Sequence, residues 1–186
     1  MSHGPRERLM MAAIELVRER GVEGTGLSDL LERSSSARRS IYQHFPGGKL
    51  ELIDASTRAA GAFAQAAIRE FGATMSSREL VTAMIRLISD SLSGSGFRLG
   101  CPIAAAAYAP ADTIAVLDAA ADAFAGWAAE IEAVLAREGR PEAEARSLAG
   151  FIVSGVEGAL LRARASRSTE PLDDAADQLT RLVQDR

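Results

Sequence analysis

The segment from Ala37 to Phe45 constrains the fold more than any other part of the chain. Its apolar residues recur every four positions at Ala37, Ile41 and Phe45, while Arg39 and Tyr42 point to the opposite side. A helix of barely two turns is not stable alone in water. It must therefore be held by neighbouring helices through its apolar side, which leaves the basic and aromatic side free.

The flanking residues predict two further short helices joined to this one by tight turns. Apolar residues at helical spacing predict a first helix over residues 6–20 and a second that begins at Leu27. Ser34, Ser35 and Ser36 break the second helix, because serines at this density favour turns, and Pro46 with two glycines stops the third. Three short helices in this order predict a helix-turn-helix unit over residues 1–50.

The remainder of the chain also has helical patterns. Ala, Leu and charged residues are frequent and aromatic residues make up only 5%, a composition that favours helices packed through small side chains. Ser76 and Glu79 have the spacing of a capping box. We expect helices over residues 49–71, 76–93, 102–109, 112–138, 141–167 and 172–183. The predicted fold is all-α, with a three-helix N-terminal domain over residues 1–50 and a helical bundle over residues 51–186.

Charge is unevenly distributed along the chain. The net charge is −4, yet residues 1–50 carry eight basic and six acidic side chains. A mildly basic end on an acidic body can bind phosphates while the acidic part opposes non-specific adhesion. The apolar stretches are too short to span a bilayer, no apolar leader precedes the charged N-terminal residues, and Cys101 is the only cysteine. We expect a cytoplasmic protein without disulfides.

The run Thr25-Gly26-Leu27-Ser28-Asp29-Leu30-Leu31, the serine turn, and Arg38-Arg39-Ser40-Ile41-Tyr42-Gln43-His44-Phe45-Pro46-Gly47-Gly48-Lys49 resemble the signature of the TetR family of repressors. The resemblance covers about a quarter of the chain without a gap. It implies a homodimer bound to a palindromic double-stranded operator. Ser35 stands where the family usually has glycine, and Arg39 where it usually has a small residue.

The third helix supplies the predicted DNA contacts. Arg38 and Arg39 can each bind two acceptors on a guanine edge, and Lys49 can bind phosphate at the positive end of the next helix. The resemblance implies phosphate contacts for Tyr42 and His44. The predicted DNA-binding residues are Arg38, Arg39, Ser40, Tyr42, Gln43, His44 and Lys49. The alternative is an ordinary solvated surface.

The segment Phe97-Arg98-Leu99-Gly100-Cys101-Pro102-Ile103-Ala104 resembles the branch of this family named for LmrA and YxaF. The resemblance implies a pocket for a small lipophilic effector among the central helices. The predicted lining is Phe63, Met84, Ile88, Ile103, Tyr108, Phe124, Trp127 and Phe151. The alternative for each of these residues is ordinary core packing.

A stripe of apolar and small residues on the last two helices predicts a dimer interface. Small residues let another backbone approach closely, and two helices from each chain would form a symmetric four-helix contact. The predicted interface is Leu148, Ile152, Gly155, Val156, Ala159, Leu172, Leu179 and Val183. Burial of this stripe within one chain is the alternative.

Other functional classes have less support. The chain lacks clustered His, Cys and carboxylate residues at metal-ligand spacing, so we expect no enzyme activity, metal or cofactor. The glycines around Ser95 lack the spacing and preceding strand of a phosphate-binding loop, and Cys101 is interpreted as a small apolar side chain, with a redox sensor as the alternative. A ligand carrier would leave the Arg-Arg-Ser-Ile-Tyr surface unexplained. The sequence therefore predicts a transcriptional repressor that leaves its DNA site when it binds a ligand.

Overall fold

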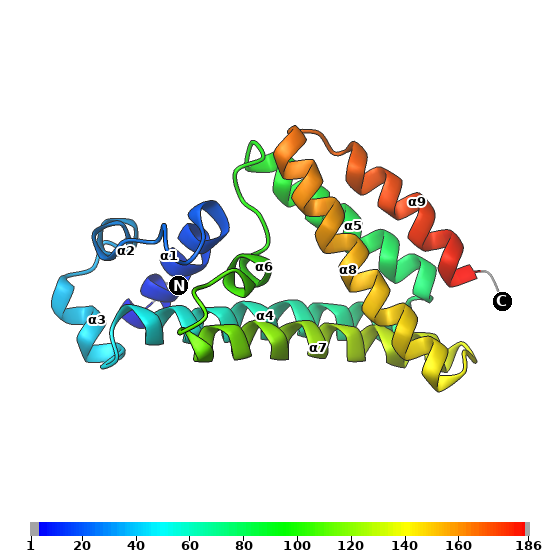
Figure 1. Cartoon of the computed structure of the whole chain (residues 1–186), viewed down its shortest axis with the longest axis horizontal. Helices are drawn as coiled ribbons and strands as arrows, with labels where there is room; N and C mark the ends of the chain where they lie inside the picture. Colours follow the sequence, from blue (N-terminus) through cyan, green and yellow to red (C-terminus); the bar gives the residue numbers. More distant parts are fainter. Residues whose placement is uncertain (1–3, 185–186) are drawn as a thin grey trace. The chain divides into compact units, whose positions relative to one another are not determined.

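The computed structural model describes residues 4–184, and these form nine α-helices without a β-strand (Figure 1). The predicted all-α fold is confirmed. The helices are α1 (Pro5–Arg20), α2 (Leu27–Ser34), α3 (Arg38–His44), α4 (Lys49–Thr74), α5 (Ser77–Gly94), α6 (Pro102–Ala107), α7 (Ile114–Arg137), α8 (Glu142–Ser166) and α9 (Glu170–Gln184).

The signals at the helix ends have clear structural counterparts. Before α5, the Ser76 hydroxyl accepts a hydrogen bond from the Glu79 amide at 3.3 Å, and the Glu79 carboxylate accepts one from the Ser76 amide at 2.8 Å. This is the predicted capping box. Ser35, after α2, has φ 49° and ψ 42°. A left-handed serine thus occupies the turn that usually takes glycine, which has no Cβ to clash there.

The chain packs as two compact units. The first comprises the residues up to Ala62 together with Cys101–Asp122, and the second comprises Phe63–Gly100 with the residues from Ala123 onward. Helices α4 and α7 each contribute to both units. The predicted division into a DNA-binding domain over residues 1–50 and a ligand-binding and dimerisation domain over residues 51–186 stays a prediction.

The first unit is built around α1. Helix α1 contacts α2, α3 and α6, and its buried side chains meet residues of α2, α3 and α4 in one apolar cluster. The cluster comprises Leu9, Ala13, Leu16, Leu30, Ile41, Phe45 and Leu52. Because α2 and α3 are too short to be stable alone, this cluster determines their positions.

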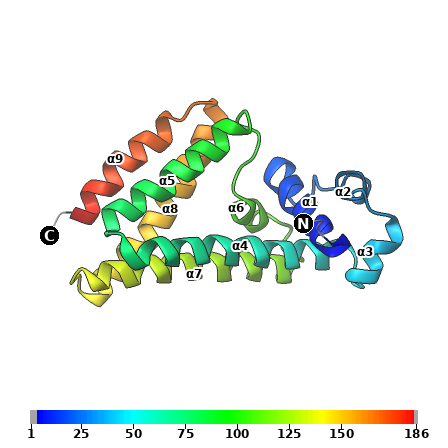
Figure 2. The same cartoon turned by 180° about the vertical axis from the view of Figure 1, so that it is seen from behind.

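In the second unit α5, α8 and α9 pack against one another (Figure 2). Helix α7 lies beside α4, with Gly126 next to the end of the Gln65 side chain. A Cβ at Gly126 would lie 2.7 Å from the side-chain oxygen of Gln65. At the C-terminal end of α4, Arg137 donates hydrogen bonds to the carbonyls of Gly72 and Met75 at 2.6 and 2.7 Å. These bonds satisfy carbonyls that a helix end leaves without internal partners.

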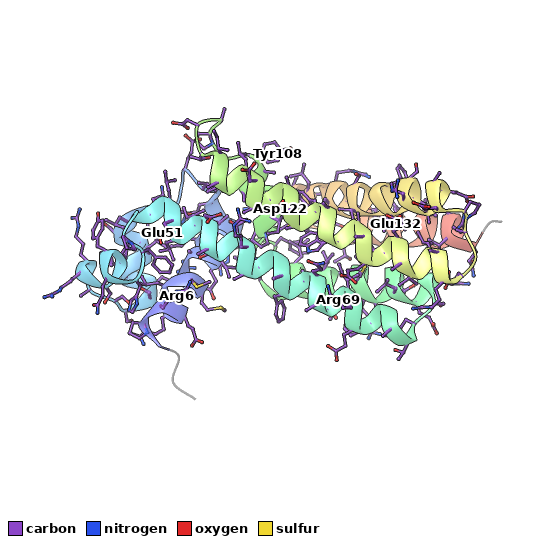
Figure 3. All side chains as sticks on the ribbon, turned by 90° about the horizontal axis from the view of Figure 1, so that it is seen from below. Arg6, Glu51, Arg69, Tyr108, Asp122 and Glu132 are labelled. Atoms are coloured by element: carbon purple, nitrogen blue, oxygen red, sulfur yellow. The ribbon has the colours of Figure 1, made fainter. Side chains whose placement is uncertain are left out.

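A polar cluster joins α4 and α7 in this unit. Glu130 accepts hydrogen bonds from Gln65 at 2.9 Å and from Arg69, labelled in Figure 3, at 2.6 Å. Arg69 holds the pKa of Glu130 below its ordinary value of 4.5. A lowered pKa in the folded state means that the contribution to stability is present at neutral pH and is lost as acid protonates the carboxylate.

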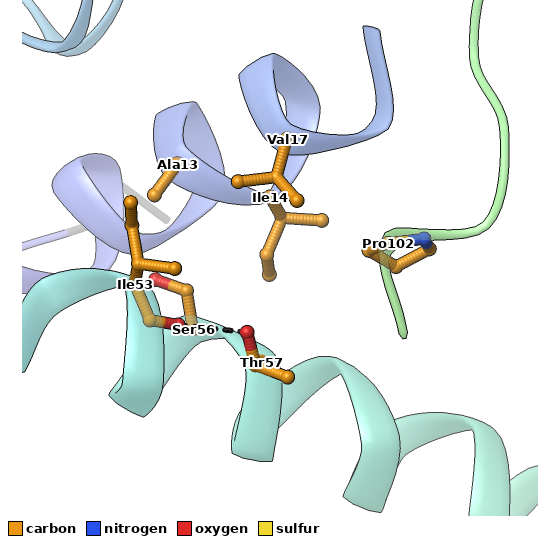
Figure 4. A pocket seen from close by; sticks show the side chains of 7 residues that line it. All are labelled: Ala13, Ile14, Val17, Ile53, Ser56, Thr57 and Pro102. Carbon is orange, nitrogen blue, oxygen red and sulfur yellow. Dashed lines mark hydrogen bonds between the residues drawn. The ribbon is translucent and has the colours of Figure 1, made fainter. Parts of the chain in front are cut away.

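The first unit also contains a hollow with an unsatisfied hydroxyl. Residues of α1, α4 and α6 line it, and Ser56 and Thr57 lie on its α4 side (Figure 4). Thr57 donates a hydrogen bond to the Ile53 carbonyl at 2.8 Å, whereas the Ser56 oxygen is buried without a partner. The hollow has no room for a water molecule that could bond to it.

We expect Ser56→Ala to raise the free energy of unfolding by about 1 kcal/mol, because an unsatisfied buried hydroxyl carries an uncompensated desolvation cost. Chemical denaturation measures the change. The matched control is Thr57→Val, which removes a bonded hydroxyl next to it and should lower stability by roughly 0.5–1 kcal/mol. Equal destabilisation by both substitutions would contradict this prediction.

Candidate nucleic-acid interface

Helix α3 is fixed through its apolar side. Ile41 is fully buried and Phe45 is 1% exposed, and both belong to the cluster around α1. The first turn of α3 has no side-chain cap and no acidic residue, so its own ends stabilise it little. Packing of these two side chains is what orients the opposite side of the helix toward solvent.

The turn after α3 fixes the start of α4. The Gly48 amide donates to the Phe45 carbonyl at 2.8 Å, and the Gly47 amide donates to the Glu51 carboxylate at 2.6 Å. Gly48 has φ 73°, and the Tyr42 ring lies 3.4 Å from the place where a Cβ would stand. A side chain at Gly48 would therefore be strained by the positive φ, and its Cβ would be in van der Waals contact with Tyr42. The tight turn at Gly48 places Lys49, the first residue of α4, close along the chain to Tyr42 of α3.

The predicted DNA-binding residues reach the surface from α3 and from the first residue of α4. Arg38, Arg39 and Gln43 are exposed, Tyr42 is 50% exposed, and the remaining three, Ser40, His44 and Lys49, are half-buried. None of the seven is buried in the body of the chain. Arg39, Tyr42 and Gln43 thus lie on the side of α3 that faces away from Ile41. Arg38 and His44, each three residues from Ile41, lie nearer its buried side, and Lys49 begins α4.

Ion pairing separates these cations from the others of the first unit. Arg20 pairs with Asp29 at 3.3 Å, and Arg33 pairs with Glu15 and Glu19 at 3.4 and 3.2 Å. Within residues 4–184, by contrast, no carboxylate forms an ion pair with three of the predicted DNA-binding residues, namely Arg38, Arg39 and Lys49. Their charges remain available to an anionic partner.

The predicted pocket residues are distributed over both units. Ile103 and Trp127 are buried, and Phe124 meets Trp127 edge to face at 5.4 Å between ring centroids. Met84 and Ile88 are half-buried. The other three, Phe63, Tyr108 (labelled in Figure 3) and Phe151, are 80%, 81% and 56% exposed. The two hollows lined by residues of α1 contain none of the eight.

The predicted interface stripe lies largely inside the second unit. Leu148 and Gly155 are half-buried, and the other six, Ile152, Val156, Ala159, Leu172, Leu179 and Val183, are buried. Leu179 of the same chain lies 3.4 Å from the position of a Cβ at Gly155. The alternative of intrachain packing accounts for the burial of these six side chains, and the role of the stripe in a dimer stays a prediction.

Another face of α8 is exposed. Phe151 and Leu161 are 56% and 61% exposed, and a Cβ at Gly158, which lies between them, would meet open space. Their neighbours Ser154 and Ala165 are also exposed. These five positions alternate in steps of three and four residues, a spacing typical of helices that pack along a seam.

Cys101 lies at the start of α6. It is half-buried, and its sulfur accepts a hydrogen bond from the Ala104 amide at 3.4 Å. Burial lowers the pKa of the nearby Arg18, and the charge of an ionised Cys101 opposes this shift. The thiol thus acts as a helix cap.

Two other kinds of feature are absent from residues 4–184. Groups of three or more His, Cys, Asp or Glu placed to hold a metal ion do not occur there. Nor does this part of the chain contain a helix with the length and hydropathy needed to cross a membrane.

Comparison with known proteins gives one consistent family. The family described as bacterial regulatory proteins, tetR family, matches residues 9–56, and the one described as transcriptional regulator LmrA/YxaF-like, C-terminal domain, matches residues 77–178. An HTH-type transcriptional regulator of Mycobacterium tuberculosis is 36% identical over 186 residues, which cover 97% of this chain and 94% of the relative. The HTH-type transcriptional regulator LmrA of Bacillus subtilis is 27% identical, with 92% and 93% covered.

Solved structures agree with the sequence relatives. A TetR transcriptional regulator from Legionella pneumophila has a TM-score of 0.85 at 22% identity over 98% of both chains. The reduced form of Escherichia coli NemR has a TM-score of 0.80 at 25% identity, over 96% of this chain and 97% of that one. The chain belongs to the TetR family of helix-turn-helix transcriptional regulators, and its C-terminal part is of the LmrA/YxaF-like type.

Proposed function

We propose that this protein is a homodimeric repressor that binds a palindromic operator and is released from it by a small lipophilic ligand. One observation carries the DNA-binding part of the proposal. The cations of α3 and of the α4 start have no carboxylate partners among residues 4–184, whereas Arg20 and Arg33 are paired. Unpaired cations on a short, firmly held helix match what a DNA backbone requires.

The seven residues divide by the kind of contact that they can make. Arg38 and Arg39 stand at the first turn of α3, the part of a recognition helix that reaches base edges. A guanidinium can bind two guanine acceptors at once, so these two would supply sequence specificity. Tyr42 and Lys49 would hold phosphates on either side of the Gly48 turn and would contribute affinity without specificity. Ser40, Gln43 and His44 would complete this surface.

Dimerisation follows from the geometry of such sites. A symmetric site presents two half-sites about 34 Å apart, so two copies of α3 must bind together. The exposed seam of α8, with Phe151 and Leu161, suits a second copy of the chain, because two such seams bury each other's apolar side chains around an axis of symmetry. Gly158 between them would allow the two backbones to approach closely.

The ligand would bind in the second unit. Phe124 and Trp127 supply an aromatic pair there, and Met84 and Ile88 are flexible or branched apolar side chains suited to a lipophilic molecule. The ligand must bind the DNA-free arrangement better than the DNA-bound one, since only differential affinity shifts the equilibrium. Helix α4 begins at Lys49 and also belongs to the second unit, so a ligand-induced shift of α4 would move a DNA contact. Trp127 is the only tryptophan of the chain, and its fluorescence reports ligand entry.

The relatives named as transcriptional regulators support a regulatory rather than a catalytic role. Binding to the bacterial chromosome would place the protein in the cytoplasm. A carrier without DNA contacts would have no use for the unpaired cations of α3.

Gel shift and fluorescence anisotropy with a duplex from the region upstream of the protein's own gene test the proposal. We expect Lys49→Gln to weaken binding to all duplexes and to reduce the salt dependence by about one contact per chain. Arg38→Gln should cost about 1–3 kcal/mol per half-site on the preferred sequence only. The control is Arg78→Gln, an exposed arginine of α5, which should change neither property. Absence of binding by the unchanged protein at low salt would refute the proposal.

The dimer is tested by light scattering coupled to gel filtration. We expect the double substitution Phe151→Glu and Leu161→Glu to yield monomers, because it places like charges opposite each other in the seam. Leu87→Glu is the control, since Leu87 is an exposed leucine of α5 at 53%, and this variant should remain dimeric. A dimer that withstands the double substitution would show that the contact lies elsewhere.

A further inference from the structure

Arg6, which is outside the predicted DNA-binding set, contacts Phe45 at the end of α3. It lies in the first turn of α1, and its guanidinium carbon stands 5.2 Å from the centroid of the Phe45 ring. Phe45 caps the C-terminus of α3 and is 1% exposed, whereas Arg6 is exposed. The guanidinium thus covers the outer face of the ring that anchors α3. Figure 3 labels Arg6 on α1.

The position of Arg6 is fixed by its own helix. Pro5 begins α1, and the Glu7 carboxylate accepts a hydrogen bond from the Gly4 amide at 3.2 Å. One nitrogen of Arg6 also lies 3.2 Å from the sulfur of Met10. With the first turn capped and the guanidinium resting between a ring and a thioether, the long side chain has lost much of its freedom before any partner arrives.

The charge of Arg6 is not neutralised within residues 4–184. No carboxylate there forms an ion pair with it, and it shares this property with Arg38, Arg39 and Lys49. A cation over an aromatic face keeps its full charge. The guanidinium carries five N–H donors, and the Met10 thioether is only a weak acceptor for one of them. The remaining donors match the two oxygens of a phosphate.

We propose that Arg6 is a further DNA contact, which binds a backbone phosphate beside the C-terminal end of α3. The inference rests on the proposed function and extends it from α3 and α4 to α1. Through Phe45, the same residue couples the phosphate contact to the side chain that orients α3. The contact adds affinity and register but no base specificity, because phosphate is the same at every position.

A purely structural role for Arg6 makes a different prediction. If the guanidinium served only to cover the Phe45 ring, an uncharged flexible side chain of similar length would replace it. Methionine is such a side chain, and it makes favourable contacts with aromatic rings. Arg6→Met therefore removes the charge of Arg6 and keeps a side chain that covers the Phe45 ring.

The experiment measures the affinity of the full-length protein for a labelled duplex of arbitrary sequence over a series of salt concentrations. For Arg6→Met we expect the slope of log affinity against log salt to fall by about 0.9 for each chain bound. For a dimer, the affinity lost between about 50 and 200 mM salt would then be about tenfold smaller than for the unchanged protein. The melting temperature should stay the same, and Arg6→Lys should retain the original slope.

Arg78→Met on α5 is the matched control and should keep the slope of the unchanged protein. An unchanged slope for Arg6→Met, with or without a lower melting temperature, would overturn the inference. If Lys49→Gln reduces the slope in the same series while Arg6→Met does not, the proposed function stands and only the role of Arg6 fails. If the unchanged protein does not bind the duplex at low salt, the proposed function itself fails.

Discussion

The burial of Ile41 and Phe45 is the interaction on which the rest of this structure depends. Helix α3 has seven residues, too few for a stable helix in water, and neither of its ends is capped by a side chain. Two apolar side chains in a cluster shared with α1 and α4 hold it in place. Because Ile41 and Phe45 anchor one side of α3, the residues on the opposite side, which include cations and a tyrosine, are not needed to hold the helix in place.

The cations of the first unit fall into two groups, those in ion pairs and those without a carboxylate partner among residues 4–184. The arginines at the interface of α1 and α2 are held in ion pairs with Asp29, Glu15 and Glu19. Such exposed pairs contribute little to stability, but they neutralise the charge of Arg20 and Arg33, which lie outside the proposed DNA-binding surface. The cations left over lie on α3, on the residue that begins α4, and on the first turn of α1. A protein with an excess of acidic residues can in this way present a local cationic surface.

The sequence predicted well those features that depend on neighbours along the chain. The turn at Ser34, Ser35 and Ser36, the capping box at Ser76 and the stop after Phe45 are local, and each has a short-range physical cause. The assignment of faces on α8 was harder. Ile152 and Val156 are apolar and regularly spaced, but periodicity does not distinguish a partner in the same chain from one in another chain. The structure assigns them to packing within the chain and leaves Phe151 and Leu161 exposed. Arg6 was missed because its contact with Phe45 joins residues far apart in the sequence.

The central claim, that the exposed side of α3 is the surface that meets DNA, is tested most directly by photocrosslinking. A photoreactive amino acid is placed at Gln43, on the exposed side of α3, and in a second protein at Met11, which is 51% exposed on α1 beside the groove between α1 and α2. Both proteins are irradiated with the duplex from the protein's own upstream region. The account predicts covalent DNA adducts from position 43 and none from position 11. Adducts from position 11 alone would contradict it.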